Sequence, residues 1–84
     1  MKKPDEIAFL RAVYQERKNG WTEKMGDEIA AELGMAPKRA YFLLNKWSER
    51  HDWWEYGVSA RTGWLTDKGL AEIPLIIKEN PNAE

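Results

Sequence analysis

The chain has 84 residues, a formal net charge of −1 at pH 7 and 43% hydrophobic residues, which suits a single small domain with its own core. It contains no cysteine and one histidine, so it lacks the residues of disulfide frameworks, thiolate metal sites and His-based catalytic triads. No apolar run approaches the roughly 20 residues that span a bilayer, and no signal-peptide core follows the two N-terminal lysines. We therefore expect a cytoplasmic protein without membrane, metal or cofactor.

Charge is distributed unevenly along the chain. Residues 1–35 carry six Lys or Arg and seven acids, residues 36–68 carry six and four, and residues 69–84 carry one and three. The middle segment therefore has a balance of +2, between segments of −1 and −2. Such a modest local excess predicts an affinity for nucleic acid that is moderate and strongly salt-dependent.

Apolar spacing and capping signals predict three helices at residues 4–19, 22–33 and 37–50 and a β-hairpin at 53–66. A C-terminal segment at residues 67–79 should contain a short helix. Trp21 suits a short strand that pairs with the hairpin, and Thr22 suits the N-cap of the second helix. Pro37 stands where a first-turn proline is tolerated, and Thr66 is the expected N-cap of the last helix. Pro74 removes a backbone donor, so the last helix should kink or end early there.

Residues 29–47 have the pattern of a helix-turn-helix. Ala30 is small where two helices must cross closely, and Gly34 stands four residues later, where the chain must turn. The third helix then has an apolar side that should face the core, made of Ala40, Leu43, Leu44 and Trp47. A hairpin follows this pair of helices directly, and that arrangement is used mostly to bind duplex DNA.

The predicted hairpin places strand-forming residues on both sides of a short polar tip, residues 59–63, which ends in glycine. The strand-forming residues are Trp53, Trp54, Tyr56 and Val58 before the tip, and Trp64 and Leu65 after it. Neighbouring residues of a strand point to opposite faces, so Trp53, Trp54 and Trp64 cannot all be buried. Core packing is favoured for them over a stacking platform for single-stranded nucleic acid.

The third helix also has a polar side, which we interpret as the DNA-reading surface. A rotation of about 100° per residue places on it Lys38, Phe42, Asn45 and Glu49, flanked by Arg39 and Lys46, with Tyr41 intermediate. Arg and Lys suit guanine or phosphate, Asn suits adenine, and an aromatic ring suits a thymine methyl group. The alternative for the charged residues is an ordinary solvated face, and Phe42 is equally suited to contacting the hairpin or a partner.

Arg61 is the strongest candidate at the hairpin tip, with Thr62 beside it, because an extended arginine there reaches a minor groove or a phosphate. The alternative is a solvated turn arginine. His51 ends the third helix, where the dipole favours a cation, so we expect a cap and not a catalytic group. The chain has no Gly-rich phosphate loop, nucleophile elbow or metal-ligand cluster, which argues against an enzyme.

These residues also resemble a known family. Residues 29–36 (IAAELGMA), together with Arg39, Ala40 and Leu43, look like the helix-turn-helix of bacterial winged-helix regulators. Residues 61–69 (RTGWLTDKG) are similar to the wing ending of MarR-like and PadR-like repressors. The resemblance covers residues 22–70 and implies a mostly helical α+β fold, a winged helix-turn-helix with a three-helix core, a two- or three-stranded β-wing and a short C-terminal helix.

The same resemblance implies which residues contact DNA. The major-groove set is Lys38, Arg39, Tyr41, Phe42, Asn45 and Lys46, and Arg61 would lie on the backbone or in the minor groove. The full-length regulators carry long dimerisation helices on both sides, which this chain does not match. Small phage regulators, including excisionase-like winged helices, match it in size.

We therefore expect a small bacterial or phage transcriptional regulator that binds double-stranded DNA and has no catalysis of its own. The alternative is a winged-helix protein-interaction module, such as a phage accessory or anti-repressor-type protein, that does not bind DNA. The acidic balance, Phe42 and the surplus of tryptophans favour that alternative. Apolar residues within 70–77 predict a weak homodimer, or a monomer that dimerises on DNA.

Overall fold

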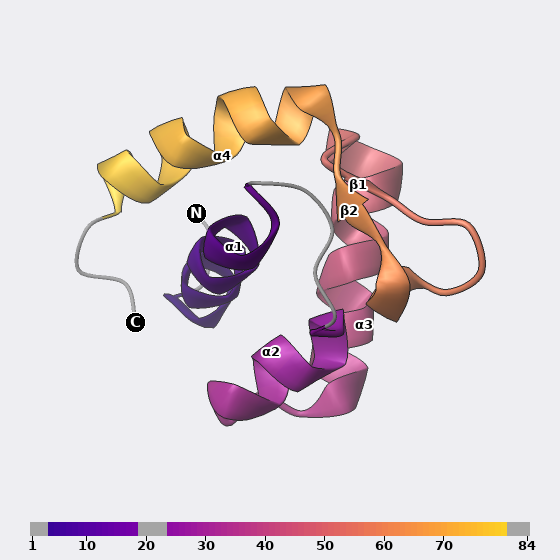
Figure 1. Ribbon diagram of the computed structural model, residues 1–84. Coiled ribbons are helices and arrows are strands. Elements are labelled where there is room, and N and C mark those ends of the chain that lie inside the picture. Colours follow the sequence, from indigo (N-terminus) through magenta and orange to yellow (C-terminus); the bar gives the residue numbers. More distant parts are fainter. Residues whose placement is uncertain (1–3, 19–23, 81–84) are drawn as a thin grey trace.

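A computed structural model of the chain describes residues 4–18 and 24–80, and these form a mostly helical α+β structure with one small antiparallel sheet (Figure 1). The elements in chain order are α1 (Pro4–Arg17), α2 (Gly26–Glu32), α3 (Pro37–Lys46), the π-helical turn η1 (Trp47–His51), β1 (Trp54–Glu55), the 3-10 turn η2 (Ala60–Thr62), β2 (Trp64–Leu65) and α4 (Asp67–Glu79). The element order matches the prediction. Within the described part of the chain, no helix combines the length and the apolar character needed to cross a membrane.

Helix α1 lies in the middle of the molecule, with α4 along one side and α2 on another (Figure 1). Five consecutive residues of α1, from Glu6 to Leu10, are buried. Four of these five residues are apolar, and the fifth, Glu6, is a buried acid with hydrogen-bond partners on the α3 segment. Phe9 is fully buried, and its ring centre lies 5.0 Å from that of Trp47.

Helix α2 begins at Gly26, four residues later than the predicted start at residue 22. The predicted cap Thr22 and the predicted strand residue Trp21 lie outside the described residues. The N-cap is Met25, whose backbone N–H donates to the Glu28 carboxylate at 3.1 Å. A Cβ at Gly26 would lie 2.8 Å from Cδ1 of Leu44, so α2 and α3 approach closely at this point.

The turn between α2 and α3 forms where it was predicted. Gly34 has a φ of 77°, a left-handed conformation that favours glycine. The N–H of Gly34 donates to the Ala31 carbonyl at 3.0 Å, and the N–H of Met35 donates to the Ala30 carbonyl at 2.9 Å. This is the Schellman pattern of helix termination. These bonds satisfy the last carbonyls of α2 and turn the chain into α3.

The predicted apolar side of α3 is confirmed, because Ala40, Leu43, Leu44 and Trp47 are all fully buried. The helical segment continues through the π-helical turn to His51, one residue beyond the predicted end at residue 50. Asp52, with a φ of 58°, ends it, and the N–H of Trp53 closes the turn on the Trp47 carbonyl at 3.0 Å. The His51 ring stacks on that of Trp53, with ring centres 4.2 Å apart.

Ala40 offers a direct test of this packing. Because its side chain has no exposed area, Ala40→Leu should overpack the core and lower the free energy of unfolding by about 1–3 kcal/mol. Urea denaturation followed by circular dichroism measures this difference. The matched control is Ala71→Leu on the exposed side of α4, which should unfold like the parent protein. Equal midpoints for both variants would mean that α3 is rotated from the described orientation.

The hairpin is present but differs from the prediction in its strand lengths. Only two residues of each strand pair, Trp54 with Leu65 and Glu55 with Trp64. Tyr56 and Val58, predicted as strand residues, lie in the loop, where Val58 is 98% exposed. The expectation that the three tryptophans are not all buried is confirmed, because Trp64 is 41% exposed. Its stated reason is wrong, because Trp53 and Trp54 are both buried: Trp53 precedes β1, so the alternation of strand residues does not apply to it.

Arg17 fixes the hairpin to the helices. Its Nε donates to the Gly63 carbonyl at 3.1 Å, its Nη2 donates to the Lys24 carbonyl at 2.5 Å, and its guanidinium lies 5.8 Å from the ring centre of Trp54. The residue is buried, and burial lowers the pKa of the guanidinium below its ordinary value. The end of α1, the start of the α2 segment and β2 are therefore joined through one side chain.

Helix α4 begins as predicted, because the Thr66 hydroxyl accepts the Gly69 N–H at 3.0 Å. Of the two outcomes predicted at Pro74, a kink or an early end, the early end is wrong, since α4 continues to Glu79, and the kink stays a prediction. Packing on the core explains the continuation: Ile73 is fully buried, and the isoleucines at 76 and 77 pack against the same cluster. These contacts use most of the apolar side of α4, leaving Leu75 60% exposed, and the homodimer expected from this segment stays a prediction.

Candidate nucleic-acid interface

Helix α3 and η1 present an exposed side that contains part of the set predicted to face DNA. Lys38 and Glu49 are exposed, and Phe42 is 57% exposed, although it is a large apolar residue. Asn45 is half-buried, and its Oδ1 accepts the Tyr56 hydroxyl at 3.3 Å. The loop after β1 therefore lies next to the C-terminal end of α3.

Tyr41 lies elsewhere. It is half-buried and packs against the hydrophobic core, so it contributes little to the exposed side of α3. The intermediate position that the helical rotation predicted for Tyr41 agrees with this placement. Its assignment to the major groove rested on the family resemblance alone.

Arg39, at one edge of α3, pairs with an acid of α1. Its Nε and Nη2 donate to the two carboxylate oxygens of Asp5 at 2.9 and 3.1 Å, and its guanidinium lies 5.7 Å from the ring centre of Phe42. The hydrogen bonds with Asp5 raise the pKa of the Arg39 guanidinium above its ordinary value. Arg39 thus stays positively charged, but an acid partly neutralises its field.

Lys46 is held by a buried acid of the same helix α1. Its Nζ lies 2.9 and 2.8 Å from the two oxygens of Glu6, whose side chain is only 3% exposed. The indole N–H of Trp47 donates to the same carboxylate at 3.0 Å. Lys46 therefore has a structural role at the contact of α1 with α3, in addition to any role at the surface.

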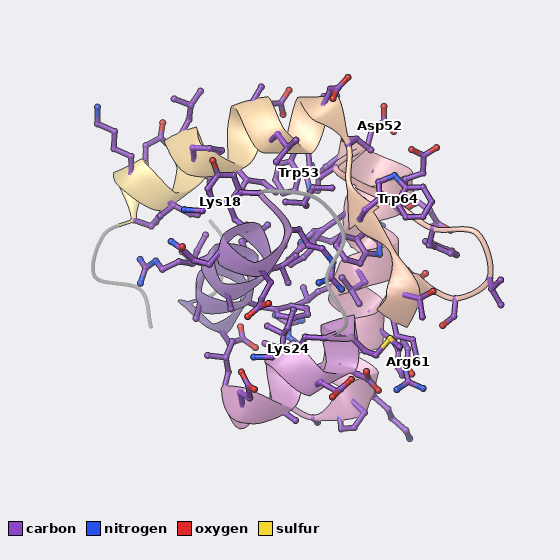
Figure 2. All side chains as sticks on the ribbon, viewed as in Figure 1. Lys18, Lys24, Asp52, Trp53, Arg61 and Trp64 are labelled. Carbon is purple, nitrogen blue, oxygen red and sulfur yellow. The ribbon has the colours of Figure 1, made fainter. Side chains whose placement is uncertain are left out.

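Arg61 and Thr62 do not form an extended hairpin tip, which corrects the predicted geometry. They lie in η2, and Figure 2 shows Arg61 close to α2 and not on the protruding loop. The Nε of Arg61 lies 3.2 Å from Asp27 of α2, and the Thr62 hydroxyl donates to the Ser59 carbonyl at 2.9 Å. A short turn of 59–63 was predicted, but the paired strands are shorter than expected, and Val58 occupies the most exposed part of the connection.

Arg50 is a candidate that the sequence interpretation missed. It is exposed in η1 and, with Phe42, Asn45, Lys46 and Glu49, lines a hollow of about 120 Å³ on the outer side of the helical segment. Its spacing of four residues from Lys46 was the available signal, because such residues share a helix face. Lys38 differs from Arg39, Lys46 and Arg61 in forming no ion pair within residues 4–18 and 24–80.

No protein-family model, curated protein or solved structure matches this chain. Among the described residues, no group of three or more His, Cys, Asp or Glu side chains is arranged to hold a metal ion.

Proposed function

We propose that this chain is a duplex-DNA-binding protein of the winged helix-turn-helix type, used as a small bacterial or phage transcriptional regulator. Helix α3 enters the major groove, and the hairpin lies over the neighbouring backbone or minor groove. Two features support the proposal: the tight turn that joins α2 to α3, and the β1–β2 hairpin that follows the α3 segment directly.

The positive charge of the α3 segment is the main support for DNA binding. Residues 37–51 contain the four cations Lys38, Arg39, Lys46 and Arg50 and one acid, Glu49, which gives a balance of +3 in a chain whose net charge is −1. Arg39 and Lys46 lie on the edge of the helix that faces α1. These two cations, Arg50 and the exposed Lys38 suit phosphates, and Phe42 and Asn45 suit base edges.

The ion pairs with acids of α1 and α2 set the expected strength of binding. Asp5 has a side chain that is 48% exposed, and a pair of this kind contributes only about 0–1 kcal/mol to stability, so a phosphate competes with it readily. Glu6 is buried and keeps Lys46 in place. We expect moderate affinity for one copy of the chain, with strong dependence on salt.

Replacing Lys38 tests the proposal, because this exposed cation makes no ion pair within the described part of the chain. Lys38→Ala should weaken binding of a labelled duplex of random sequence and reduce the slope of log K against log salt by about 0.9, the value of one lost phosphate contact. Fluorescence anisotropy at several salt concentrations measures both quantities.

The matched control is Lys78→Ala, which removes the same charge from the exposed last turn of α4. It should bind DNA like the parent protein, since α3 and the end of α4 lie on opposite sides of the molecule (Figure 1). Equal losses in the two variants, or no duplex binding by the parent protein at low salt, would contradict the proposal.

A second candidate function is a protein-interaction module that does not bind DNA. The exposure of Phe42 favours it, as do the acids that pair with Arg39, Lys46 and Arg61. The same titration separates the two functions, because this module would leave the duplex unbound at every salt concentration.

A further inference from the structure

The outer face of the hairpin carries a hollow of about 650 Å³, between the end of the α3 segment and the start of α4. Asp52, Glu55, Trp64 and Asp67 line it, and Figure 2 shows Asp52 and Trp64 at this end of the molecule. Its volume is within the range of about 300–1,000 Å³ that is typical of ligand clefts. None of the predicted DNA-facing residues lines this hollow.

Trp64 differs from the other described tryptophans. The indole N–H groups of Trp47, Trp53 and Trp54 donate to Glu6, Glu72 and the Ala60 carbonyl, and these three side chains are at most 2% exposed. Trp64 is 41% exposed, and within the described residues its indole N–H has no hydrogen-bond partner. Trp64 is therefore the described tryptophan that presents exposed side-chain surface to the hollow.

The charge around Trp64 is acidic. Three carboxylates, those of Asp52, Glu55 and Asp67, and one cation, Lys68, line the hollow, which gives a balance of −2. All three acids are exposed, and within residues 4–18 and 24–80 none of them forms an ion pair. By contrast, Asp5 and Asp27 each pair with an arginine.

We propose that this hollow binds a basic segment of a partner protein, with one Lys or Arg side chain over the Trp64 ring and a second cation paired with Glu55 or Asp67. Tryptophan is the side chain whose ring attracts cations most strongly, and a guanidinium forms charge-assisted hydrogen bonds with carboxylates. Glu55 pairs with Trp64 across the two antiparallel strands, so the two side chains lie on the same face of the hairpin. The negative balance repels phosphate, which argues against nucleic acid at this face, so a hairpin that lies over a DNA backbone does so with a different side.

The experiment titrates the full chain into a short fluorescent peptide of alternating arginine and glycine, with a serine-glycine peptide of equal length as the uncharged probe. Trp64→Leu keeps an apolar side chain but removes the ring, and it should weaken binding of the basic peptide by about two- to thirtyfold. Glu55→Gln combined with Asp67→Asn should weaken binding and flatten its salt dependence. Melting temperatures of the variants report whether each one is folded.

Two matched controls accompany these variants. Glu79→Gln removes an exposed acid at the far end of α4, and Lys38→Ala changes the exposed side of α3; both should bind the basic peptide like the parent protein. Equal affinity of the parent protein and a folded Trp64→Leu variant would overturn the proposal. So would free arginine that binds as tightly as the peptide, since the site would then be one for a small molecule.

Discussion

Gly63→Ala should lower the free energy of unfolding by about 3 kcal/mol or more, the largest effect that we expect from adding a single methyl group to this chain. A Cβ at Gly63 would lie 2.5 Å from the Glu55 carbonyl oxygen and 2.5 Å from Nε1 of Trp54. The Trp54 ring is buried and its N–H is bonded to the Ala60 carbonyl at 2.7 Å, so the ring cannot move without losing this contact, and the Glu55 carbonyl belongs to the paired backbone of β1. The Gly63 carbonyl also accepts the Arg17 side chain.

Gly57→Ala is the control for this change. No atom outside its immediate neighbours lies within 4 Å of a Cβ at Gly57, so this variant should differ from the parent protein by no more than about 0.5 kcal/mol. Urea denaturation of the two variants, followed by tryptophan fluorescence, gives the comparison. If Gly63→Ala unfolded at the same urea concentration as Gly57→Ala, β1 and β2 would not lie as close together as described.

The need for glycine at position 63 could not be predicted from the sequence. Gly63 was predicted to end a hairpin turn, and it lies directly before β2. Its φ of −81°, however, is available to other residues. Its necessity comes from the nearness of Trp54 and Glu55, which depends on how the two strands pack. A local pattern contains no information about such an approach.

Features set by neighbouring residues were predicted well. The buried side of α3 followed from helical periodicity, the turn at Gly34 from the need for a left-handed residue, and the start of α4 from a Thr66 cap. The hairpin strands were predicted too long, because the β propensity of Tyr56 and Val58 does not determine whether a partner strand lies opposite them.

The candidate interface was predicted only in part, because helical spacing determines which side chains face outward but not which distant residues pair with them. Helical rotation identified which residues of α3 face outward, because that depends on spacing alone. It did not identify the acids that pair with them: Asp5 and Arg39 are 34 residues apart in sequence, and Glu6 and Lys46 are 40 apart. These pairs change the interpretation of Arg39 and Lys46, which hold α3 to α1 as well as facing the surface.

Glu6→Ala should consequently destabilise the chain much more than removal of the neighbouring acid. The Glu6 carboxylate is buried and bonds both the Lys46 ammonium and the Trp47 indole N–H, so its loss leaves a buried donor and a half-buried cation without their partner. We expect a loss of about 2–4 kcal/mol in the free energy of unfolding. Asp5→Ala, which removes a half-exposed carboxylate from the Arg39 pair, should cost no more than about 1 kcal/mol.

Glu6→Gln distinguishes the two contacts of Glu6. The amide oxygen still accepts the Trp47 N–H but carries no charge to pair with Lys46, so this variant should be more stable than Glu6→Ala and less stable than the parent protein. Urea denaturation of Glu6→Ala, Glu6→Gln and Asp5→Ala gives the order. If Glu6→Ala were as stable as Asp5→Ala, Glu6 would not be buried against α3. Lys46 would then be free to act at the surface alone, and its replacement would report on DNA binding without a loss of stability.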